Sequence, residues 1–407
     1  MNVYLDLKAK LHSFKILSSK ANHHNMKNIL ILRNSLDSHK TGVDRVSFLL
    51  KKELKCRGYN CFDGCVNGEN TTNRKDVLEY DFNKSKKFVL KTFLEFIKLY
   101  NIDVVIIQGF MDANINNAIL HLKNKSNCKF VFCLHNDPSV YKRKIPLSVL
   151  DQLKNLIWYF AKFQTIILDY RKYRLKMLSK MYNNADKFVL LSRNYVANLC
   201  KTIKIQNLNK IACINNLPTF KVQPMDFSKK KKQVLILCRL EEYYKNISAA
   251  LRIWKRIEDI GTYGWNLAIV GTGVDEKKLK NYATTLNLKK AAFLGETSEP
   301  EKFYQESSLF MMTSHSEGWP MTLLEAQQYG CVPVAFNTFA ALSEIIENEV
   351  NGYIIEKNNE LQFVQTLIKL MKDEISLQKL SQNSLIKSQN YSSKAIGDKW
   401  ESLLREL

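Results

Sequence analysis

Short apolar runs, often rich in β-branched residues, recur along the chain and are separated by segments in which apolar residues repeat every three or four positions. In the first half of the chain the runs occupy positions 28–32, 103–107, 129–134, 186–191 and 210–214. In the second half they occupy positions 234–238, 265–270, 309–312 and 332–336, and Leu294 and Gly295 close one more. Strands that alternate with helices in this way predict an α/β fold, with mostly parallel sheets covered by helices on both faces.

A polar stretch divides the chain into two halves. Positions 218–233 carry proline, aspartate, serine and four consecutive lysines without an apolar period, which is typical of a domain linker. We therefore predict a first domain at 26–217 and a second at 234–378, each large enough for its own core, followed by a mostly helical segment at 379–407. Positions 1–25 form an extension that either folds as a short amphipathic helix or precedes the native start.

The 407 residues carry a formal net charge of +22, the one outlying number in an otherwise globular composition with 45% hydrophobic residues. So large a positive charge implies an acidic partner, which could be anionic lipid, a phosphate-bearing substrate or nucleic acid. The nine cysteines are scattered, several of them within apolar runs, and favour a reducing cytoplasm. No apolar run approaches about 18 residues, so we expect a chain that is neither secreted nor membrane-spanning.

One stretch, positions 313–330, combines a strand end, a tight loop and a helix. Pro320 suits the first helical position and Gly330 suits the helix end. Glu317 in the loop and Glu325 in the helix have seven residues between them, so both can face the space above the helix start. Unpaired N–H groups at such a point bind phosphate, and two carboxylates that accept hydroxyl groups suit a sugar attached to a nucleotide diphosphate. The alternative is two solvated surface carboxylates.

The run Ser-Glu-Gly-Trp-Pro-Met-Thr-Leu-Leu-Glu-Ala in this stretch, followed by Gly-Cys-Val-Pro-Val-Ala, resembles the signature of the retaining family 4 glycosyltransferases, which have the GT-B fold. The resemblance extends over most of the chain from Met26 onward. It implies two Rossmann-like domains that face each other across a cleft, and a C-terminal helix, bearing a residue such as Trp400, that crosses back onto the first domain. It also implies transfer of a hexose from a nucleotide-diphosphate sugar to a saccharide acceptor, with retention of anomeric configuration.

The resemblance assigns roles to five charged or ionisable side chains. In the family a histidine at a strand end lies beside the reacting carbon of the donor sugar, and His135 matches it. Arg239 and Lys245 match the family's cations, which neutralise the departing diphosphate. Glu317 then holds hydroxyl groups of the donor sugar, and Glu325 holds the ribose. Without the resemblance, single side chains of these types are more often ordinary structural or surface residues.

The remaining expected donor contacts involve glycines and backbone groups. Gly271 and Gly273 follow a strand and let the backbone approach a nucleotide, and Leu294 lies where the family seats the base. Gly42 is the one match to the glycine-rich loop that closes over the donor phosphate in the family. At the helix start in the 313–330 stretch, the expected contacts are Gly318, Trp319, Pro320, Met321 and Thr322.

Positions 140–182 interleave ten lysines and arginines with tryptophan, tyrosine and phenylalanine. Basic and aromatic residues together suit an anionic membrane surface or single-stranded nucleic acid, and a pair of ordinary helices is the plainer alternative. We favour the membrane, because acceptors of the resembled transferases are often lipid-linked.

No Asp-x-Asp sequence occurs, which removes the commonest metal-diphosphate site of the other large transferase fold, so we expect catalysis without a metal or other cofactor. From the resemblance we expect UDP-hexose rather than GDP-mannose as the donor, and a role in bacterial surface polysaccharide synthesis at the inner face of the cytoplasmic membrane. A nucleic-acid-binding protein is the alternative of another class, although glutamates at strand ends would repel phosphates. A nucleotide-sugar epimerase and a phosphorylase are further alternatives with the same fold.

Overall fold

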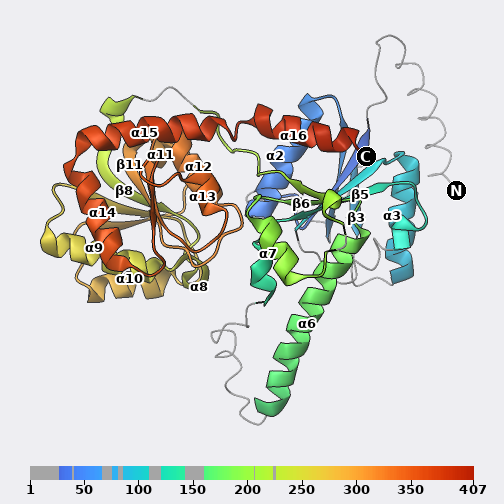
Figure 1. Cartoon of the computed structure of the whole chain (residues 1–407), viewed down its shortest axis with the longest axis horizontal. Coiled ribbons are helices and arrows are strands. Elements are labelled where there is room, and N and C mark those ends of the chain that lie inside the picture. The colour runs from blue at the N-terminus through green and yellow to red at the C-terminus, as the bar shows by residue number, and fades with distance from the viewer. Residues whose placement is uncertain are drawn as a thin grey trace, which may run out of the picture.

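The computed structural model describes residues 27–38, 41–66, 76–80, 86–109, 121–142, 160–205, 207–222 and 226–407. The predicted extension at 1–25 lies outside the described residues. So does much of the basic and aromatic segment, since positions 143–159 are not described and, beyond Val140 and Tyr141, its side chains are described only from Arg171 onward. Within the described parts, the chain forms two α/β domains (Figure 1).

The first domain is built on one parallel sheet with the strand order β3-β2-β1-β4-β5-β6-β7. The central strands are continuous apolar runs, as burial on both faces of a parallel sheet requires. The strands are β1 (Asn28–Arg33), β2 (Asn60–Val66), β3 (Val77–Tyr80), β4 (Val104–Gln108), β5 (Lys129–Leu134), β6 (Lys187–Leu190) and β7 (Ile211–Cys213).

Helices cover both faces of this sheet. Leu50 of α2 packs with Ile31 on one face, and Phe93 of α3 packs with Leu30 on the other. Helix α2 starts where it does because the Thr41 hydroxyl accepts a hydrogen bond from the first turn. Helix α6 projects away from the domain (Figure 1). The helices are α2 (Gly42–Cys56), α3 (Lys86–Leu99), η1 (Pro138–Lys142), α6 (Phe160–Asn184), α7 (Tyr195–Thr202) and η3 (Leu208–Lys210).

The second domain repeats this architecture around a parallel sheet with the order β10-β9-β8-β11-β12-β13. Its strands are β8 (Lys231–Leu237), β9 (Asn266–Val270), β10 (Ala291–Gly295), β11 (Ser307–Met312), β12 (Val332–Phe336) and β13 (Tyr353–Ile355). Its helices are η4 (Phe227–Lys229), α8 (Glu242–Lys245), α9 (Ile247–Ile260), α10 (Glu276–Thr285), α11 (Pro300–Glu306), α12 (Met321–Gln328), α13 (Leu342–Ile345), α14 (Glu360–Lys372) and α15 (Glu374–Gln389).

The last helix, α16 (Ser393–Arg405), returns to the first domain (Figure 1). Its residues Trp400 and Leu404 are buried in one apolar cluster with Ile29 of β1 and Leu54 of α2. Ion pairs from Arg57 of α2 to residues of α16 reinforce the contact, both at 2.8 Å, to Asp398 and Glu401. The helix at the C-terminal end of the chain is therefore part of the first domain's core.

The structure differs from the sequence-based expectation at several places, which include the start of β8 and the strands β2, β3 and β13, none of which the apolar runs predicted. Strand β8 begins at Lys231, so the predicted linker at 218–233 ends earlier than its lysine run suggested. Strand β2 is absent from the predicted strands because Asp63 interrupts its apolar pattern. Asp63 is tolerated in the interior because it pairs with Arg33 at 2.9 Å and with Lys51.

Candidate active site

The loop at 313–320 connects β11 to α12 and touches the first domain. A Cβ atom at Gly318 would lie 1.7 Å from the carbonyl oxygen of His135, so only glycine lets the loop pass this close to the end of β5. The hydroxyl of Tyr195 on α7 donates to the carbonyl oxygen of Gly318 at 2.5 Å and to that of Glu317 at 3.1 Å. The loop is therefore fixed by two elements of the first domain, at the carboxyl ends of both sheets, where α/β proteins hold ligands.

An ion pair in this region joins the Lys245 ammonium and the Glu317 carboxylate at 2.6 Å. The two side chains are only 20% and 12% exposed. Burial alone lowers the pKa of Lys245, but the carboxylate of Glu317 outweighs burial, and the pKa is raised. Asn246, in the left-handed conformation, turns the chain sharply from α8 into α9 and so sets the position of Lys245. The structure brings together two residues that are 72 positions apart.

Arg239 follows β8 but is not part of this ion pair. Its side chain is 66% exposed, and its guanidinium pairs with the carboxylate of Glu241 at 3.0 Å. Its positive charge lies near enough to lower the pKa of Lys245, against the effect of Glu317. The guanidinium expected to be fixed at the strand end is thus an exposed group at the edge of the site.

Glu325 lies inside the second domain, with 3% of its surface exposed. One carboxylate oxygen accepts a hydrogen bond from the Thr219 hydroxyl at 2.5 Å, and the other accepts one from the Tyr304 hydroxyl at 2.8 Å. Burial, followed by the charge of Glu325, raises the pKa of Tyr304 well above its usual value, so the phenol stays a donor. The two glutamates of the motif do not share a partner, and a ribose at Glu325 would have to replace the Thr219 hydroxyl.

The start of α12 offers backbone groups. Pro320 was predicted at the first helical position but is the N-cap residue, so the helix begins one residue later, at Met321. Within the described part of the chain, no side chain caps this end. Met321 and Thr322 lie in the first turn and are partly exposed, so their N–H groups are available to an anion. Trp319 is buried and packs edge-to-face on Tyr391, with ring centroids 5.2 Å apart. Its indole is therefore a core group, and only backbone groups at this helix start can contact a nucleotide-sugar donor.

Two of the predicted glycines, Gly271 and Gly273, serve close backbone packing. Cβ atoms at Gly271 and Gly273 would lie 1.9 Å and 2.5 Å from the carbonyl oxygens of Cys238 and Leu240, so the pair lets the loop after β9 pack on the segment that follows β8. Leu294 on β10 is 48% exposed, an unusual degree for leucine and one that leaves its side chain open to a planar ring. Gly42 begins α2 in open space.

His135 forms a hydrogen bond between its Nε2 and the Oε1 of Gln108 at 2.6 Å. Since an amide oxygen only accepts, Nε2 carries the proton and Nδ1 is an acceptor. Burial lowers the pKa of His135 to about 4. The imidazole is therefore neutral near pH 7 and takes part as a hydrogen-bonding group without a charge.

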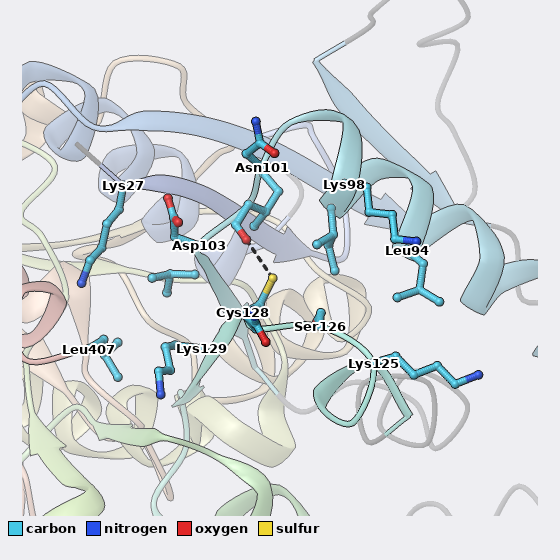
Figure 2. Close-up of a pocket in the computed structure, with 14 residues that line it drawn as sticks. Lys27, Leu94, Lys98, Asn101, Asp103, Lys125, Ser126, Cys128, Lys129 and Leu407 are labelled. Carbon is cyan, nitrogen blue, oxygen red and sulfur yellow. Dashed lines mark hydrogen bonds between the residues drawn. The ribbon is translucent and has the colours of Figure 1, made fainter. Parts of the chain in front are cut away.

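A cavity of about 500 Å³ lies at the opposite end of the first sheet, among the amino ends of β1, β4 and β5 (Figure 2). Lysines line it, including Lys27 and Lys129, and the thiol of Cys128 donates to the carbonyl oxygen of Ile102 at 2.8 Å. None of the predicted site residues contributes to it. The carboxyl ends of the strands, where the motif residues meet, remain the better candidate.

Four side chains that shape the site were not predicted from the sequence, namely Gln108, Tyr195, Thr219 and Tyr304. Gln108 ends β4, so the strand-end rule that indicated His135 would also have found Gln108. The other three carry no comparable signal, because the two tyrosines have the character of ordinary core residues and Thr219 falls in the predicted linker.

Several solved structures share this two-domain arrangement. HepE from Anabaena in complex with UDP superposes with a TM-score of 0.70 and 16% identity, over 93% of this chain and 100% of HepE. TarM superposes with a TM-score of 0.71 and 14% identity, over 94% of this chain and 99% of TarM. At such identities the likeness concerns the fold alone, and it confirms the predicted GT-B fold with two facing Rossmann-like domains.

A family model matches a part of the chain that contains most of the second domain. Residues 219–386 match the family model described as Glycosyl transferases group 1. That match confirms the resemblance to glycosyltransferases stated from the motif, while the assignment to family 4 stays a prediction.

Two curated bacterial relatives match over somewhat more than half of this chain. An uncharacterized glycosyltransferase of Haemophilus influenzae is 29% identical over 225 residues, which is 54% of this chain and 61% of the relative. The amylovoran biosynthesis glycosyltransferase AmsD of Erwinia amylovora is 29% identical over 230 residues, which is 55% of this chain and 63% of the relative. The matches thus span about three fifths of the length of these relatives.

Proposed function

We propose that this protein is a retaining glycosyltransferase that moves a hexose from UDP-hexose to a saccharide or lipid-linked saccharide during synthesis of a bacterial surface polysaccharide. The observation that carries the proposal is the Lys245–Glu317 ion pair, which is fixed against the first domain through Gly318 and Tyr195. A cation for a diphosphate and an acid for sugar hydroxyl groups are adjacent at the junction of two domains. This is the arrangement that a nucleotide-sugar donor requires.

The proposed chemistry depends on stabilising the diphosphate as it leaves. Lys245, the N–H groups of Met321 and Thr322, and the exposed Arg239 supply positive charge, so no metal is needed in this mechanism. Glu317 accepts hydroxyl groups of the hexose when the diphosphate draws Lys245 toward itself. Neutral His135, whose Nε2 proton is donated to Gln108, offers its acceptor Nδ1 beside the anomeric carbon without repelling the positive charge that develops on the sugar.

The choice of UDP rests on relatives and neighbours. One relative, from Escherichia coli, is named UDP-Gal:alpha-D-GlcNAc-diphosphoundecaprenol alpha-1,3-galactosyltransferase, and it is 33% identical over 109 residues. HepE has been solved with UDP and with UDP-glucose. These names support a uridine nucleotide as the donor. GDP-mannose is the alternative donor.

We also propose that the protein works at the inner face of the cytoplasmic membrane. Among the described helices, none has the length and apolar character needed to cross a bilayer. Helix α6 projects from the first domain and carries the exposed lysines Lys172 and Lys176 (Figure 1). Together with the net charge of +22, this projection favours contact with anionic lipid headgroups, which would bring a lipid-linked acceptor to the cleft.

Thermal unfolding of the purified chain against a panel of nucleotide sugars tests the donor. We expect UDP-hexoses to raise the unfolding temperature and GDP-mannose to leave it unchanged, since binding to the folded state alone stabilises it. Analysis of the product's anomeric linkage by NMR then tests retention. A rise with GDP-mannose only would overturn the UDP assignment, and no rise with any nucleotide sugar would overturn the donor site itself.

Filter binding with random single-stranded RNA at physiological salt tests the alternative of another class. Binding that weakens steeply as salt rises would favour a nucleic-acid-binding protein. We expect no such binding, because the glutamates that follow the strand ends would repel a phosphate backbone.

A further inference from the structure

A second cavity, of about 480 Å³, lies on another part of the boundary between the domains. Arg193 reaches it from the segment after β6 and Asn215 from the segment after β7. Lys387 near the end of α15, Lys399 of α16 and Glu344 of α13 line the remaining walls. The cavity is therefore one to two strands away from the end of β5, where Gly318 meets His135.

The charges in this cavity are unbalanced. Arg193, Lys387 and Lys399 face a single carboxylate, Glu344. One oxygen of Glu344 already accepts hydrogen bonds from the Ser192 hydroxyl at 2.5 Å and from a backbone N–H at 3.1 Å. Within the described residues, none of the three cations forms an ion pair with a carboxylate.

Lys399 shows the effect of this crowding. Its ammonium donates to the side-chain oxygen of Asn215 at 3.0 Å, a neutral partner. Burial, and then the charge of Arg193, lowers the pKa of Lys399, although Glu344 acts in the opposite direction. An anion in the cavity would supply the negative charge that the protein itself does not provide.

The residues that line this cavity belong to both domains. Lys399 moves with the first domain, because Arg57 of α2 forms ion pairs with Asp398 and Glu401 on the same helix. Lys387 moves with the second domain, because α15 is anchored there, for example by a hydrogen bond from Ser384 to a backbone carbonyl at 2.6 Å. An anion that touches both lysines therefore bridges the two domains.

We propose that this cavity is a second anion site, separate from the donor site, and that it takes a phosphate-bearing group and favours one arrangement of the two domains. A ligand with a single carboxylate would not neutralise the charge of three cations. A multiply charged group such as a diphosphate therefore fits better. The proposal goes beyond the glycosyltransferase function and does not depend on it.

Calorimetric titration with inorganic pyrophosphate tests the site. The titration is run at about 0.15 M salt, which screens diffuse surface attraction, and without UDP, whose own diphosphate could fill the cavity. The variant Lys245→Ala, titrated in parallel, shows which part of the binding belongs to the proposed donor site. We expect the wild-type chain to bind pyrophosphate, and the double variant Lys387→Gln with Lys399→Gln to bind it at least tenfold more weakly.

A matched control removes the same charge from the same two helices outside the cavity. The double variant Lys379→Gln with Lys394→Gln changes exposed lysines of α15 and α16 and should keep the wild-type affinity within about twofold. Equal weakening in both double variants would mean attraction to the overall positive charge and would overturn the site. Absence of pyrophosphate binding by the wild-type chain would also overturn it. Binding of UDP is measured in a separate titration and tests the proposed donor site independently.

Discussion

The loop that carries Glu317 and the helix that carries Glu325 are consecutive in the chain, but their carboxylates meet different kinds of partner. Glu317 is paired with a cation, Lys245, beside the first domain. Glu325 is enclosed by two hydroxyl groups, one from Tyr304 and one from Thr219 in the segment that connects the domains. The first partner is a charge that a ligand can compete for, whereas the second pair closes a buried network.

This difference separates two tasks within one motif. Residues of the loop can change partners when a donor binds, so their substitution should affect turnover. Glu325 anchors the connecting segment, and its neighbour Gln328 adds a hydrogen bond to the carbonyl oxygen of Phe220 at 2.8 Å. Substitution of Glu325 should therefore affect the stability of the fold as well as the nucleotide.

The largest effect is expected for Lys245→Ala on the loop side. Loss of a preorganised charge at a leaving diphosphate costs roughly 3 kcal/mol, so we expect turnover to fall by about a hundredfold. Steady-state kinetics with the accepted donor measures it. Arg239→Ala is the comparison: because this guanidinium is exposed, we expect a loss nearer tenfold. Full activity of the Lys245 variant would remove Lys245 from the diphosphate site.

On the helix side, Glu325→Ala should lower the free energy of unfolding by about 2 kcal/mol, because two hydroxyl groups lose their acceptor in the interior. Urea denaturation measures the change, and Glu317→Ala should show a smaller one. If both variants lose the same stability, the contrast between loop and helix is wrong.

The same helix-side variants also test the ribose contact. Calorimetry with UDP should show weaker binding to Glu325→Ala, and unchanged or tighter binding to Thr219→Ala, because that variant frees the carboxylate for the ribose. Unchanged UDP affinity in the Glu325 variant would leave this residue a purely structural role.

A smaller effect is expected for Tyr195→Phe, which removes the hydroxyl that holds the loop from the first domain. One hydrogen bond of this kind is worth about 1 kcal/mol, so we expect turnover to fall about fivefold with little change in the KM for the donor. Tyr391→Phe is the matched control, since its hydroxyl donates to the carbonyl oxygen of Glu344 inside the second domain. Equal losses in both variants would indicate a general effect on packing.

The smallest effect concerns pH. The pKa of His135 is about 4 in the folded protein and near 6.5 in an unfolded chain. As pH falls from about 6.5 toward 4, the unfolded chain binds a proton that the folded protein does not, so this contribution to stability is lost on acidification. His135→Gln should make urea unfolding less sensitive to pH in this window. An identical pH dependence in wild type and variant would mean that the buried imidazole titrates normally.

Sequence patterns predicted those elements whose signal is local. Continuous apolar runs marked β1, β4 and β5 to within a residue or so at each end, and the strand-end rule singled out His135. Strand β2 escaped because its Asp63 is compatible with burial only beside Arg33, which no local pattern reveals.

The residues of the site also divide into those that the sequence predicted and those that it could not predict. The motif and the resemblance indicated Lys245 and Glu317, whose contact the structure then displays. The surroundings of Glu325 could not be predicted, because Thr219 lies 106 positions away and only the assembled fold brings the hydroxyl to the carboxylate. Partner residues of this kind are set by tertiary packing, about which periodicity carries no information.

The return of α16 to the first domain has a consequence for how the protein is made. Synthesis proceeds from the N-terminus, and domains generally fold as they emerge. Here the core around β1 stays incomplete until Trp400 and Leu404 have left the ribosome, whereas the second domain already has its sheet and α15 by then. The half of the molecule that is translated first is thus the half that finishes folding last.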